Sequence, residues 1–477
     1  MIKKPMKILL SDIPLSSENK FGPFKRVGST FPPVNLLYLG TQLKRYNYEV
    51  RITTDGCSFD EVKELILDFK PHIIGLTFMT IGVANLKRFI EMILEVSPKS
   101  ILVAGGYHSS LFPEEILTQY PKISVVFKGE AELTIIKFAE LCRDGFPTSS
   151  ELKEIPGIVF RDHGGEIVPT GDAPMIKNLD DLPFPDLSLI PDFFKKFHPA
   201  INRHYLAAPQ ALLLSGRGCP FDCYFCGRKI LGRTIRKHSV EYLIELIKYY
   251  KHQYNVRSIV YGDEFLTFNR KHTYHFCEEL HKNDLTDIHW CCSGRADNMD
   301  YEFAKNLRKA GCKQIGYGCE SGSQMILDNI NKKVTVDRMS HAVREASKAG
   351  LQVFGNFMLG CPGETLDTIE ETYSFIMSNP IGFIVICFFT PLPGSHFWEN
   401  REYLKYGSIV SDDPLSFNLF SGIPFVPHGL SEKVLRESRN RIYKDFYLNP
   451  ARILKELKYI TNKNSWRFLA RVLGVSH

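Results

Sequence analysis

Three cysteines lie close together on one glycine-rich stretch of the sequence, SGRGCPFDCYFCGRK. Cys219, Cys223 and Cys226 have the spacing CxxxCxxC. Thiolates this close can hold three irons of a cuboidal iron–sulfur cluster and leave a fourth iron without a protein ligand. A structural zinc site normally takes four ligands, and buried free cysteines seldom cluster so regularly. The spacing therefore favours a [4Fe-4S] cluster whose open iron can bind a substrate.

These cysteines follow the first strand of a series of alternating strands and helices. Apolar runs predict strands near 211–215, 257–261, 288–293, 313–317, 352–359 and 382–389. Amphipathic stretches predict helices near 239–254, 270–283, 301–310, 336–349 and 365–378. Six units of this size indicate an open, incomplete parallel barrel, and barrel active sites lie at the carboxyl ends of the strands. We therefore expect the cysteines and the segments after the other strands to share one edge.

The cysteine motif, with the aromatic Phe225 before its last cysteine, resembles the signature of radical S-adenosylmethionine (radical SAM) enzymes. The match extends to the segment after the second strand, Tyr261-Gly262-Asp263-Glu264. It resembles the family's turn whose backbone carbonyls take the amino group of the methionine moiety. The resemblance implies that Phe225, Gly262, Asp263 and Glu264 border the bound S-adenosylmethionine.

The later strand ends continue this resemblance in order and spacing through 211–394. Arg295, after the third strand, offers a guanidinium fork for the carboxylate of S-adenosylmethionine, and Lys332 is a weaker candidate. Glu320 lies in a segment that resembles a family segment whose carboxylate can form hydrogen bonds with the ribose hydroxyls. Gly360 and Pro362 lie in a turn that resembles the glycine-rich turn on the adenine side. For each charged residue the alternative is an ordinary exposed ion pair.

A separate strand–helix alternation precedes the barrel, from Lys7 to about Leu141. Short apolar runs (KILL, EVRIT, HIIGLT, ILVAGG and ISVVF) are separated by amphipathic stretches. This pattern predicts a parallel, doubly wound sheet, which binds ligands at the carboxyl ends of its strands. Small or polar residues stand at those ends, at 77–80, 105–108 and 129–132. They suit a large cofactor, although glycine pairs also make tight turns.

Residues 5–142 resemble the cobalamin-binding domain that precedes the barrel in one large subclass of the family, judged by PPVNLLYLGTQL, GLTFMT, AGGYHSSLFPEE and KGEAE. Many cobalamin domains carry a loop that gives cobalt a lower histidine ligand, but Ser11 to Val27 contains no histidine. The resemblance therefore implies cobalt bound without that ligand. His108 lies instead on the glycine loop, which lines the nucleotide tail in this subclass, and we expect it to be an ordinary loop histidine. The implied cobalamin contacts are Thr77, Met79, Thr80, Gly105, Gly106, His108, Gly129 and Glu130.

The expected fold is therefore α/β. It comprises an N-terminal doubly wound Rossmann-like cobalamin-binding domain (1–144), a proline-rich linker (145–206) with a small hairpin near 157–169, a partial (β/α)6 TIM-type radical SAM barrel (207–415) and a helical C-terminal region (416–477). The remaining cysteines on barrel strands are expected to be small buried hydrophobes.

Composition narrows the class of partner. A formal net charge of +6, from 59 basic and 53 acidic side chains, is far from the concentrated basic patches of nucleic-acid-binding proteins. Twelve cysteines in 477 residues are too sparse for a disulfide framework, and no secretory signal pattern is visible. We expect a cytoplasmic protein with reduced thiols, without a transmembrane helix and without a nucleic-acid partner.

The C-terminal segment from Glu432 is basic, with eleven lysines and arginines against four acids. Apolar residues form two helical faces, Ile453, Leu454, Leu457 and Ile460 on one and Trp466, Leu469, Val472 and Leu473 on the other. Amphipathic helices bury such faces against something. The first expectation is docking on the barrel, and the alternative is peripheral contact with a membrane surface.

The two resemblances together imply a reaction. Reductive cleavage of S-adenosylmethionine at the cluster gives a 5'-deoxyadenosyl radical, and transfer of a methyl group from cobalamin to the substrate radical gives C-methylation. The motifs fit equally a subclass member that oxidises, hydroxylates, closes or contracts a ring without methyl transfer. The expected substrate is a small molecule, a lipid or a natural-product precursor. The expected electron donor is a flavodoxin or ferredoxin, and the cavity must exclude oxygen.

Other functions fit less well. A methylthiotransferase shares the barrel signature but needs a second cysteine trio in its first domain, where only Cys57 and Cys142 occur. A cobalamin sensor or an RNA-binding scaffold with a structural metal is the alternative from a different class. It predicts a reduced protein that does not cleave S-adenosylmethionine. Catalytic residues beyond the cluster and S-adenosylmethionine itself are not identifiable from the motifs.

Overall fold

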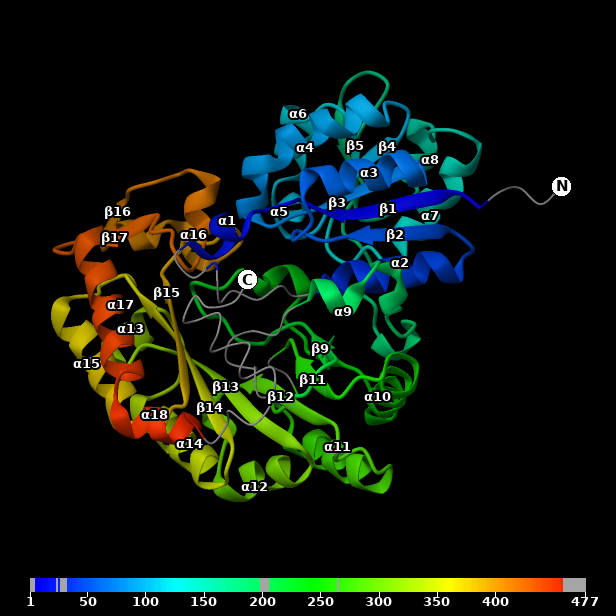
Figure 1. Ribbon diagram of the computed structural model, residues 1–477. Helices are drawn as coiled ribbons and strands as arrows, with labels where there is room; N and C mark the ends of the chain where they lie inside the picture. Colours follow the sequence, from blue (N-terminus) through cyan, green and yellow to red (C-terminus); the bar gives the residue numbers. More distant parts are fainter. Residues whose placement is uncertain (1–4, 23–24, 26–31, 198–205, 264–265, 458–477) are drawn as a thin grey trace. The chain divides into compact units, whose positions relative to one another are not determined.

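The computed structural model describes residues 5–22, 25, 32–197, 206–263 and 266–457, which form two compact units (Figure 1). The first unit takes in Met1–Lys20, Pro32–Phe197 and Asp413–Leu415, and the second takes in the rest of the chain. The first unit therefore extends beyond the expected domain of 1–144 and includes most of the segment expected as a linker.

The first unit contains a seven-stranded sheet in the order β2-β1-β3-β4-β5-β6-β7, of which β1 to β5 are parallel. Its inner parallel strands are largely apolar and mostly buried, as expected when both faces of a sheet are covered, whereas the edge strand exposes Arg51. The strands are β1 (Lys7–Asp12), β2 (Glu49–Thr53), β3 (Ile73–Thr77), β4 (Ile101–Gly105), β5 (Ile123–Phe127), β6 (Ile158–Arg161) and β7 (Ile167–Pro169).

Helices connect these strands and cover the sheet. Because parallel crossovers are right-handed, the reversal of strand order at β1 sends α2 to one face and α3 and α4 to the other. The packing agrees, since α3 contacts α4 and α2 contacts α7. The switch between β1 and β3 is where sheets of this order bind ligands. The helices are α1 (Ser17–Phe21), α2 (Val34–Arg45), α3 (Phe59–Phe69), α4 (Val83–Val96), α5 (Tyr107–Leu111), α6 (Pro113–Gln119), α7 (Thr134–Leu141), α8 (Ser149–Lys153) and α9 (Phe193–Lys196).

The hairpin expected near 157–169 is present, as β6 and β7, but it is part of the sheet. β6 pairs antiparallel with β5, with Val159 opposite Val126. Ile158, Val159 and Phe160 are completely buried. The apolar hairpin thus covers an edge of β5 that would otherwise be open, which is why this segment does not behave as a linker.

The second unit is built on a six-stranded parallel sheet in the order β15-β14-β13-β12-β11-β8, which makes β8 and β15 its two edges. Sequential order with open edges confirms the predicted partial barrel. The strands are β8 (Gln210–Leu213), β11 (Ser258–Tyr261), β12 (His289–Gly294), β13 (Cys312–Glu320), β14 (Gln352–Leu359) and β15 (Phe383–Phe388). Two short antiparallel pairs accompany it, β9 (Gly216–Arg217) with β10 (Arg236–Lys237) and β16 (Gly407–Ile409) with β17 (Phe425–Pro427).

The helices between these strands lie on the outside of the sheet in Figure 1. They are α10 (Val240–Tyr254), α11 (Arg270–Lys282), α12 (Tyr301–Lys309), α13 (Gln324–Asn329), α14 (Val336–Lys348) and α15 (Leu366–Ser378), and the short helix α16 (His396–Asn400) follows the last strand. The sequence pattern did not predict α13. This short helix follows β13 directly and leads into the loop 330–333.

Two C-terminal helices, α17 (Glu432–Tyr447) and α18 (Pro450–Leu457), follow the barrel. The Tyr447 hydroxyl donates to the Ile384 carbonyl at 3.0 Å, and the Ile386 N–H donates to the Tyr443 hydroxyl at 2.8 Å. Helix α17 thus binds backbone groups of the edge strand β15, which is docking on the barrel. Ile460, Trp466, Leu469, Val472 and Leu473 lie outside the described residues. Within the described chain, no helix has the length and apolar character to cross a membrane.

Candidate functional sites

The three motif cysteines lie on the loop that follows β9. The Cys219 N–H donates to the Gly232 carbonyl at 3.0 Å, and the Cys226 N–H donates to the Cys223 carbonyl at 3.1 Å. All three cysteines are half-buried, whereas eight of the other nine are buried. Burial raises the pKa of the Cys223 thiol, and Lys332 and Arg295 are the cations that act in the opposite direction. Accessible thiols with cations beside them fit an anionic cluster.

The described residues contain no group of three His, Cys, Asp or Glu side chains that converge on a single metal ion. A mononuclear zinc site needs four such ligands, so this alternative gains no support. In a cuboidal cluster each thiolate binds a different iron, and the ligands do not converge on one point. The cluster prediction therefore rests on the CxxxCxxC spacing of the loop.

The segment after β11 is tied to the base of the cysteine loop. The Gly262 N–H donates to the Leu213 carbonyl at 2.8 Å. Asp263 is buried, and its carboxylate accepts hydrogen bonds from the Ser215 N–H and, at 2.7 Å, from the Ser215 hydroxyl. The Asp263 side chain therefore holds the strand that leads into the cysteine loop. Glu264 lies outside the described residues.

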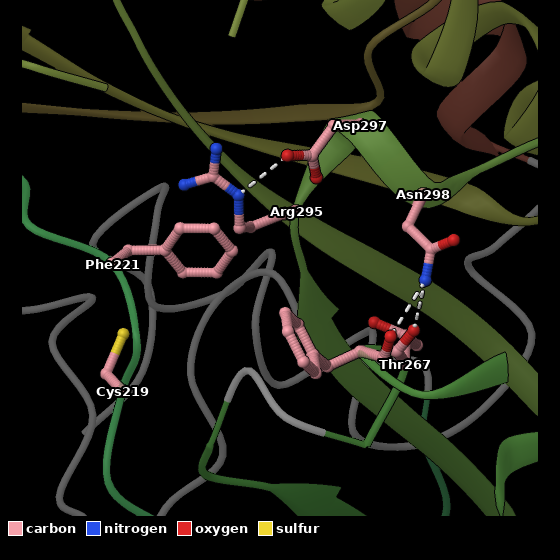
Figure 2. A pocket seen from close by; sticks show the side chains of 7 residues that line it. Cys219, Phe221, Thr267, Arg295, Asp297 and Asn298 are labelled. Atoms are coloured by element: carbon pink, nitrogen blue, oxygen red, sulfur yellow. Dashed lines mark hydrogen bonds and ion pairs between the residues drawn. The ribbon is translucent and has the colours of Figure 1, made fainter. Parts of the chain in front are cut away.

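Arg295 faces a pocket of about 240 Å³ next to Cys219 (Figure 2). Its guanidinium carbon lies 3.7 Å from the ring centre of Phe221. Arg295 Nε forms an ion pair with Asp297 at 3.0 Å, and Nη2 donates to the carbonyls of Lys332 and Lys333 at 3.0 and 3.2 Å. Within the described residues, Arg295 Nη1 forms no hydrogen bond or ion pair of this kind. Arg295 thus connects Asp297 with the backbone at Lys332 and Lys333.

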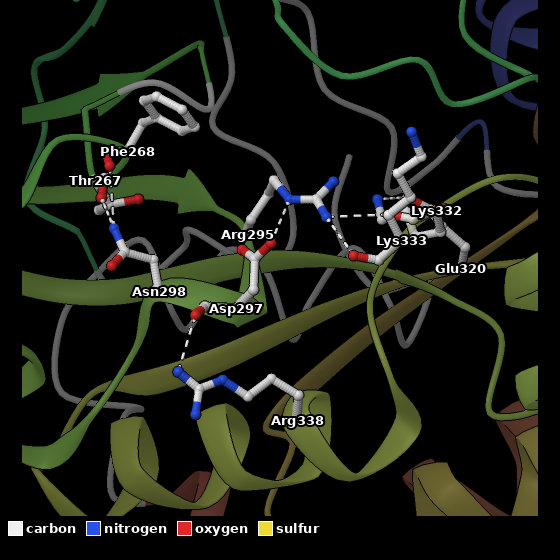
Figure 3. Close-up of polar contacts among 9 residues, drawn as sticks. All are labelled: Thr267, Phe268, Arg295, Asp297, Asn298, Glu320, Lys332, Lys333 and Arg338. Atoms are coloured by element: carbon white, nitrogen blue, oxygen red, sulfur yellow. Dashed lines mark hydrogen bonds and ion pairs between the residues drawn. The ribbon is translucent and has the colours of Figure 1, made fainter.

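Glu320 and Lys332 form a buried ion pair, with 2.8 Å between Oε1 and Nζ (Figure 3). A Cβ on Gly318 would lie 2.5 Å from that carboxylate and 3.0 Å from the ammonium, so glycine makes room for the pair. Lys332 Nζ is also 5.9 Å from the ring centre of Phe225. The structure therefore connects the expected ribose carboxylate, the weaker carboxylate-binding candidate and the aromatic of the cysteine motif.

The turn after β14 contains Gly360 and Pro362, and the Pro362 carbonyl accepts a hydrogen bond from Asn329 Nδ2 at 3.1 Å. Glu364, which sequence reasoning missed, closes this turn by accepting hydrogen bonds from the N–H groups of Gly360 and Cys361. Burial raises the pKa of Glu364 to about 8. The sequence feature that could have identified Glu364 is its position, four residues after Gly360 and just before α15.

In the first unit, Thr77, Gly105 and Gly106 meet at the carboxyl ends of β3 and β4, where Thr77 is the register partner of Gly105. Gly106 has φ of +86°, and a Cβ there would overlap the Thr77 hydroxyl. Asp12, at the end of β1, is the register partner of Thr77 on its other side. Burial raises the pKa of Asp12 to about 8, with Asp55 as a further cause. This edge therefore presents close-packed backbone and one buried carboxyl with a raised pKa at the switch between β1 and β3.

His108 is buried against Phe112, and its Nδ1 lies 3.1 Å from the Thr80 hydroxyl. Burial lowers the pKa of His108 to about 4, so the ring is neutral at pH 7. Met79 projects from the same edge with 54% of its surface exposed. The strand end therefore carries an uncharged imidazole and an exposed thioether.

Gly129 and Glu130 follow β5. The Gly129 N–H donates to the Ser110 hydroxyl at 3.0 Å, and no atom lies within 4 Å of a Cβ built at this glycine. Glu130 is buried and accepts a hydrogen bond from the Ile176 N–H at 3.0 Å. Gly129 thus leaves open space at the edge, whereas the Glu130 carboxylate anchors a distant part of the same unit.

Comparison with known proteins agrees with this arrangement. Residues 213–376 match the model of the radical SAM superfamily, and residues 24–139 match that of the B12 binding domain. An uncharacterized methyltransferase of Pyrococcus horikoshii is 30% identical over 95% of both chains. An anaerobic magnesium-protoporphyrin IX monomethyl ester cyclase of Cereibacter sphaeroides is 28% identical over 89% of this chain and 68% of its own.

A solved structure shows the same fold. The cobalamin-dependent S-adenosylmethionine radical enzyme OxsB, with aqua-cobalamin and S-adenosylmethionine bound, aligns with a TM-score of 0.72 at 18% identity. The alignment covers 99% of this chain and 75% of OxsB. Together these matches confirm the cofactors predicted from the sequence, a [4Fe-4S] cluster, S-adenosylmethionine and cobalamin. The chain belongs to the radical SAM superfamily, as a cobalamin-dependent enzyme with a B12 binding domain.

Proposed function

We propose that this cobalamin-dependent radical SAM enzyme is a C-methyltransferase that acts on an unactivated carbon of a small-molecule substrate. The observation that carries the proposal is the match along 95% of both chains with a relative named as a methyltransferase. The geometry is compatible with it, because one chain carries both a cysteine loop beside a pocket that Arg295 lines and a sheet edge with glycines at its strand ends.

The chain's own residues position and shield the reactants. When bound, the cluster supplies the electron that cleaves S-adenosylmethionine, and cobalamin carries the methyl group. Cys219, Cys223 and Cys226 would hold the cluster, and Nη1 of Arg295 would bind a carboxylate. Glu320 would accept hydrogen bonds from ribose hydroxyls. These groups lie in or beside the barrel. Their proposed role is to orient the reactants and to exclude water and oxygen from them.

The remaining contacts are assigned on the same basis. Phe225, Gly262, Asp263, Glu264 and Lys332 would border the methionine end of S-adenosylmethionine, and Gly360 and Pro362 would border the adenine. At the first sheet, cobalamin would be contacted by Thr77, Met79, Thr80, Gly105, Gly106, His108, Gly129 and Glu130. The neutral His108 is buried against Thr80, so we assign it to the wall of the site and not to cobalt.

A second candidate is an oxidoreductase or cyclase that uses the same radical chemistry without methyl transfer. The match to a cyclase over 89% of this chain favours it. The residues described here are shared by both reactions, because both begin with reductive cleavage of S-adenosylmethionine. The fate of the methyl group therefore separates the two candidates.

The test uses anaerobically reconstituted full-length protein with cobalamin, a reductant and S-adenosylmethionine labelled in its methyl group. We expect 5'-deoxyadenosine and a labelled product with candidate lipids, peptides or natural-product precursors. Production of 5'-deoxyadenosine with an unlabelled product would replace the methyltransferase with the oxidoreductase or cyclase. The Cys223→Ala variant is the control and should form no 5'-deoxyadenosine.

Reduction of the cluster needs an external partner, for which we propose a flavodoxin or ferredoxin. Cysteines that hold an iron–sulfur cluster must stay reduced, as in the cytoplasm, and we therefore propose a cytoplasmic location. Peripheral contact of the C-terminal segment with a membrane is the alternative to docking on the barrel. It is tested by sedimentation of the protein with anionic lipid vesicles.

A further inference from the structure

The loop 330–333, between α13 and α14, contacts the cysteine loop on both sides of Cys223. The Tyr224 N–H donates to the Ile330 carbonyl at 3.0 Å. Asn331 Nδ2 donates to the Asp222 carbonyl at 2.7 Å, across 109 positions of sequence. Both bonds go to backbone atoms of the residues that flank Cys223. The loop 330–333 therefore fixes the backbone from which this thiol projects.

Three features fix the conformation of the loop 330–333. Asn331 and Lys333 have positive φ angles of 52° and 53°, a conformation that asparagine tolerates better than most residues. Arg295 holds the carbonyls of Lys332 and Lys333, and the Lys332 ammonium is paired with Glu320 (Figure 3). Contacts other than those of the Asn331 side chain therefore hold the backbone of the loop 330–333 in place. The Asn331 carboxamide reaches the cysteine loop from this fixed backbone.

We infer that Asn331 is a positioning residue for the iron–sulfur cluster, acting through the Asp222 carbonyl on the thiolate of Cys223. The inference rests on the proposed cluster site. Groups that orient metal ligands without touching the metal commonly change metal affinity by about 10- to 100-fold when they are replaced. A fixed Cys223 backbone keeps the thiolate in place for its iron, whereas a loose one lets the cluster dissociate.

Two substitutions separate this role from a purely conformational one. Asn331→Asp keeps the size of the side chain and its tolerance of positive φ, but it replaces the donor with an oxygen that faces the Asp222 carbonyl. Asn331→Gly keeps the backbone conformation and removes the donor without adding repulsion. A conformational role predicts that both variants behave as the wild type. A positioning role predicts that the aspartate variant is affected more than the glycine variant.

Asn255 provides a matched control. It also has a positive φ of 52°, at the C-terminal cap of α10, and its side chain is exposed. Asn255→Asp and Asn255→Gly repeat the same changes away from the cysteine loop. Thermal unfolding and circular dichroism of all four variants show whether each is folded.

The experiment measures iron per chain after anaerobic reconstitution, the rate of iron loss to a chelator, and the electron paramagnetic resonance spectrum of the reduced cluster. We expect Asn331→Asp to lose iron about tenfold faster than the wild type, with altered g values, Asn331→Gly to be intermediate, and both Asn255 variants to match the wild type. Wild-type rates and spectra for both folded Asn331 variants would overturn the inference. A wild type that takes up no cluster, like Cys223→Ala, would instead overturn the proposed cluster site.

Discussion

The carboxyl edges of the two parallel sheets carry different chemistry. At the first sheet, β3 and β4 end in Thr77, Gly105 and Gly106, and their neighbour His108 is neutral. At the second sheet, the strands end beside charged groups that pair with one another, Arg295 with Asp297 and Glu320 with Lys332. The first edge thus offers backbone and small side chains, and the second offers charge.

This difference follows from what each edge is proposed to hold. A large, preformed cofactor needs space and close approach of the backbone, which glycine permits. A charged sulfonium substrate and an anionic cluster need charges that are already in place, and buried charges persist only when they are paired. Substitutions at the second edge should therefore act through lost charge pairing, and those at the first edge through lost space.

The largest expected effect is from Lys332→Met. This change leaves Glu320 buried without its partner, and breaking a buried pair in this way costs about 3–5 kcal/mol. The measurement is the free energy of unfolding in urea without cofactors. The control is the double variant Glu320→Gln/Lys332→Met, in which no buried charge is left unpaired and part of the stability should return. A double variant less stable than Lys332→Met alone would contradict the assignment of charge pairing to this edge.

Gly106→Ala tests the importance of space at the first edge. Alanine at a φ of +86° is strained, and its Cβ would overlap the Thr77 hydroxyl. We expect a loss of about 3 kcal/mol of stability and weaker binding of cobalamin, followed by the change in its visible absorbance. Gly129→Ala is the matched control. Its φ is +65° with nothing within 4 Å, so only backbone strain of about 1–2 kcal/mol remains. Equal losses in the two variants would show that contact with Thr77 is unimportant.

The sequence predicted the strands of both sheets well because most of them are short, largely apolar runs with at least one buried face. It did not predict that β6 joins the first sheet, since Ile158, Val159 and Phe160 satisfy the same local pattern in a free hairpin. The register of β6 against β5 is a long-range pairing, and no local pattern encodes it.

Local sequence patterns likewise do not encode the long-range contacts that hold the residues of the site. Arg295 was identified as a carboxylate-binding candidate, but the carbonyls that occupy its Nη2 belong to Lys332 and Lys333, 37 and 38 positions away. Asn331 and Glu364 were missed because their partners are backbone groups, which every residue has. Residue type therefore revealed the groups that could carry chemistry, and only the fold revealed which of them are held by the chain.

Glu364→Gln should change how stability depends on pH. The folded-state pKa of Glu364 is about 8, above that of an unfolded glutamate. The native state therefore keeps a proton that the unfolded state releases, and wild-type stability falls as pH rises from about 4.5 to 8. Glutamine removes this contribution, so the stability of the variant relative to wild type should rise by on the order of 2 kcal/mol between pH 6 and 8.5. Parallel pH profiles of the melting temperature would contradict the assignment.

His108→Asn should show the opposite dependence at the first edge. The folded-state pKa of His108 is about 4, below that of an unfolded histidine. The unfolded state therefore binds a proton that the native state refuses, and wild-type stability is lost as pH falls from about 6.5 to 4. Asparagine does not titrate, so its stability relative to wild type should rise by on the order of 1 kcal/mol as pH falls from 7 to 5. Melting temperatures across this range test the effect. A difference independent of pH would mean that His108 has the same pKa in the folded and unfolded states, and burial at the first edge would then not be what keeps the ring neutral.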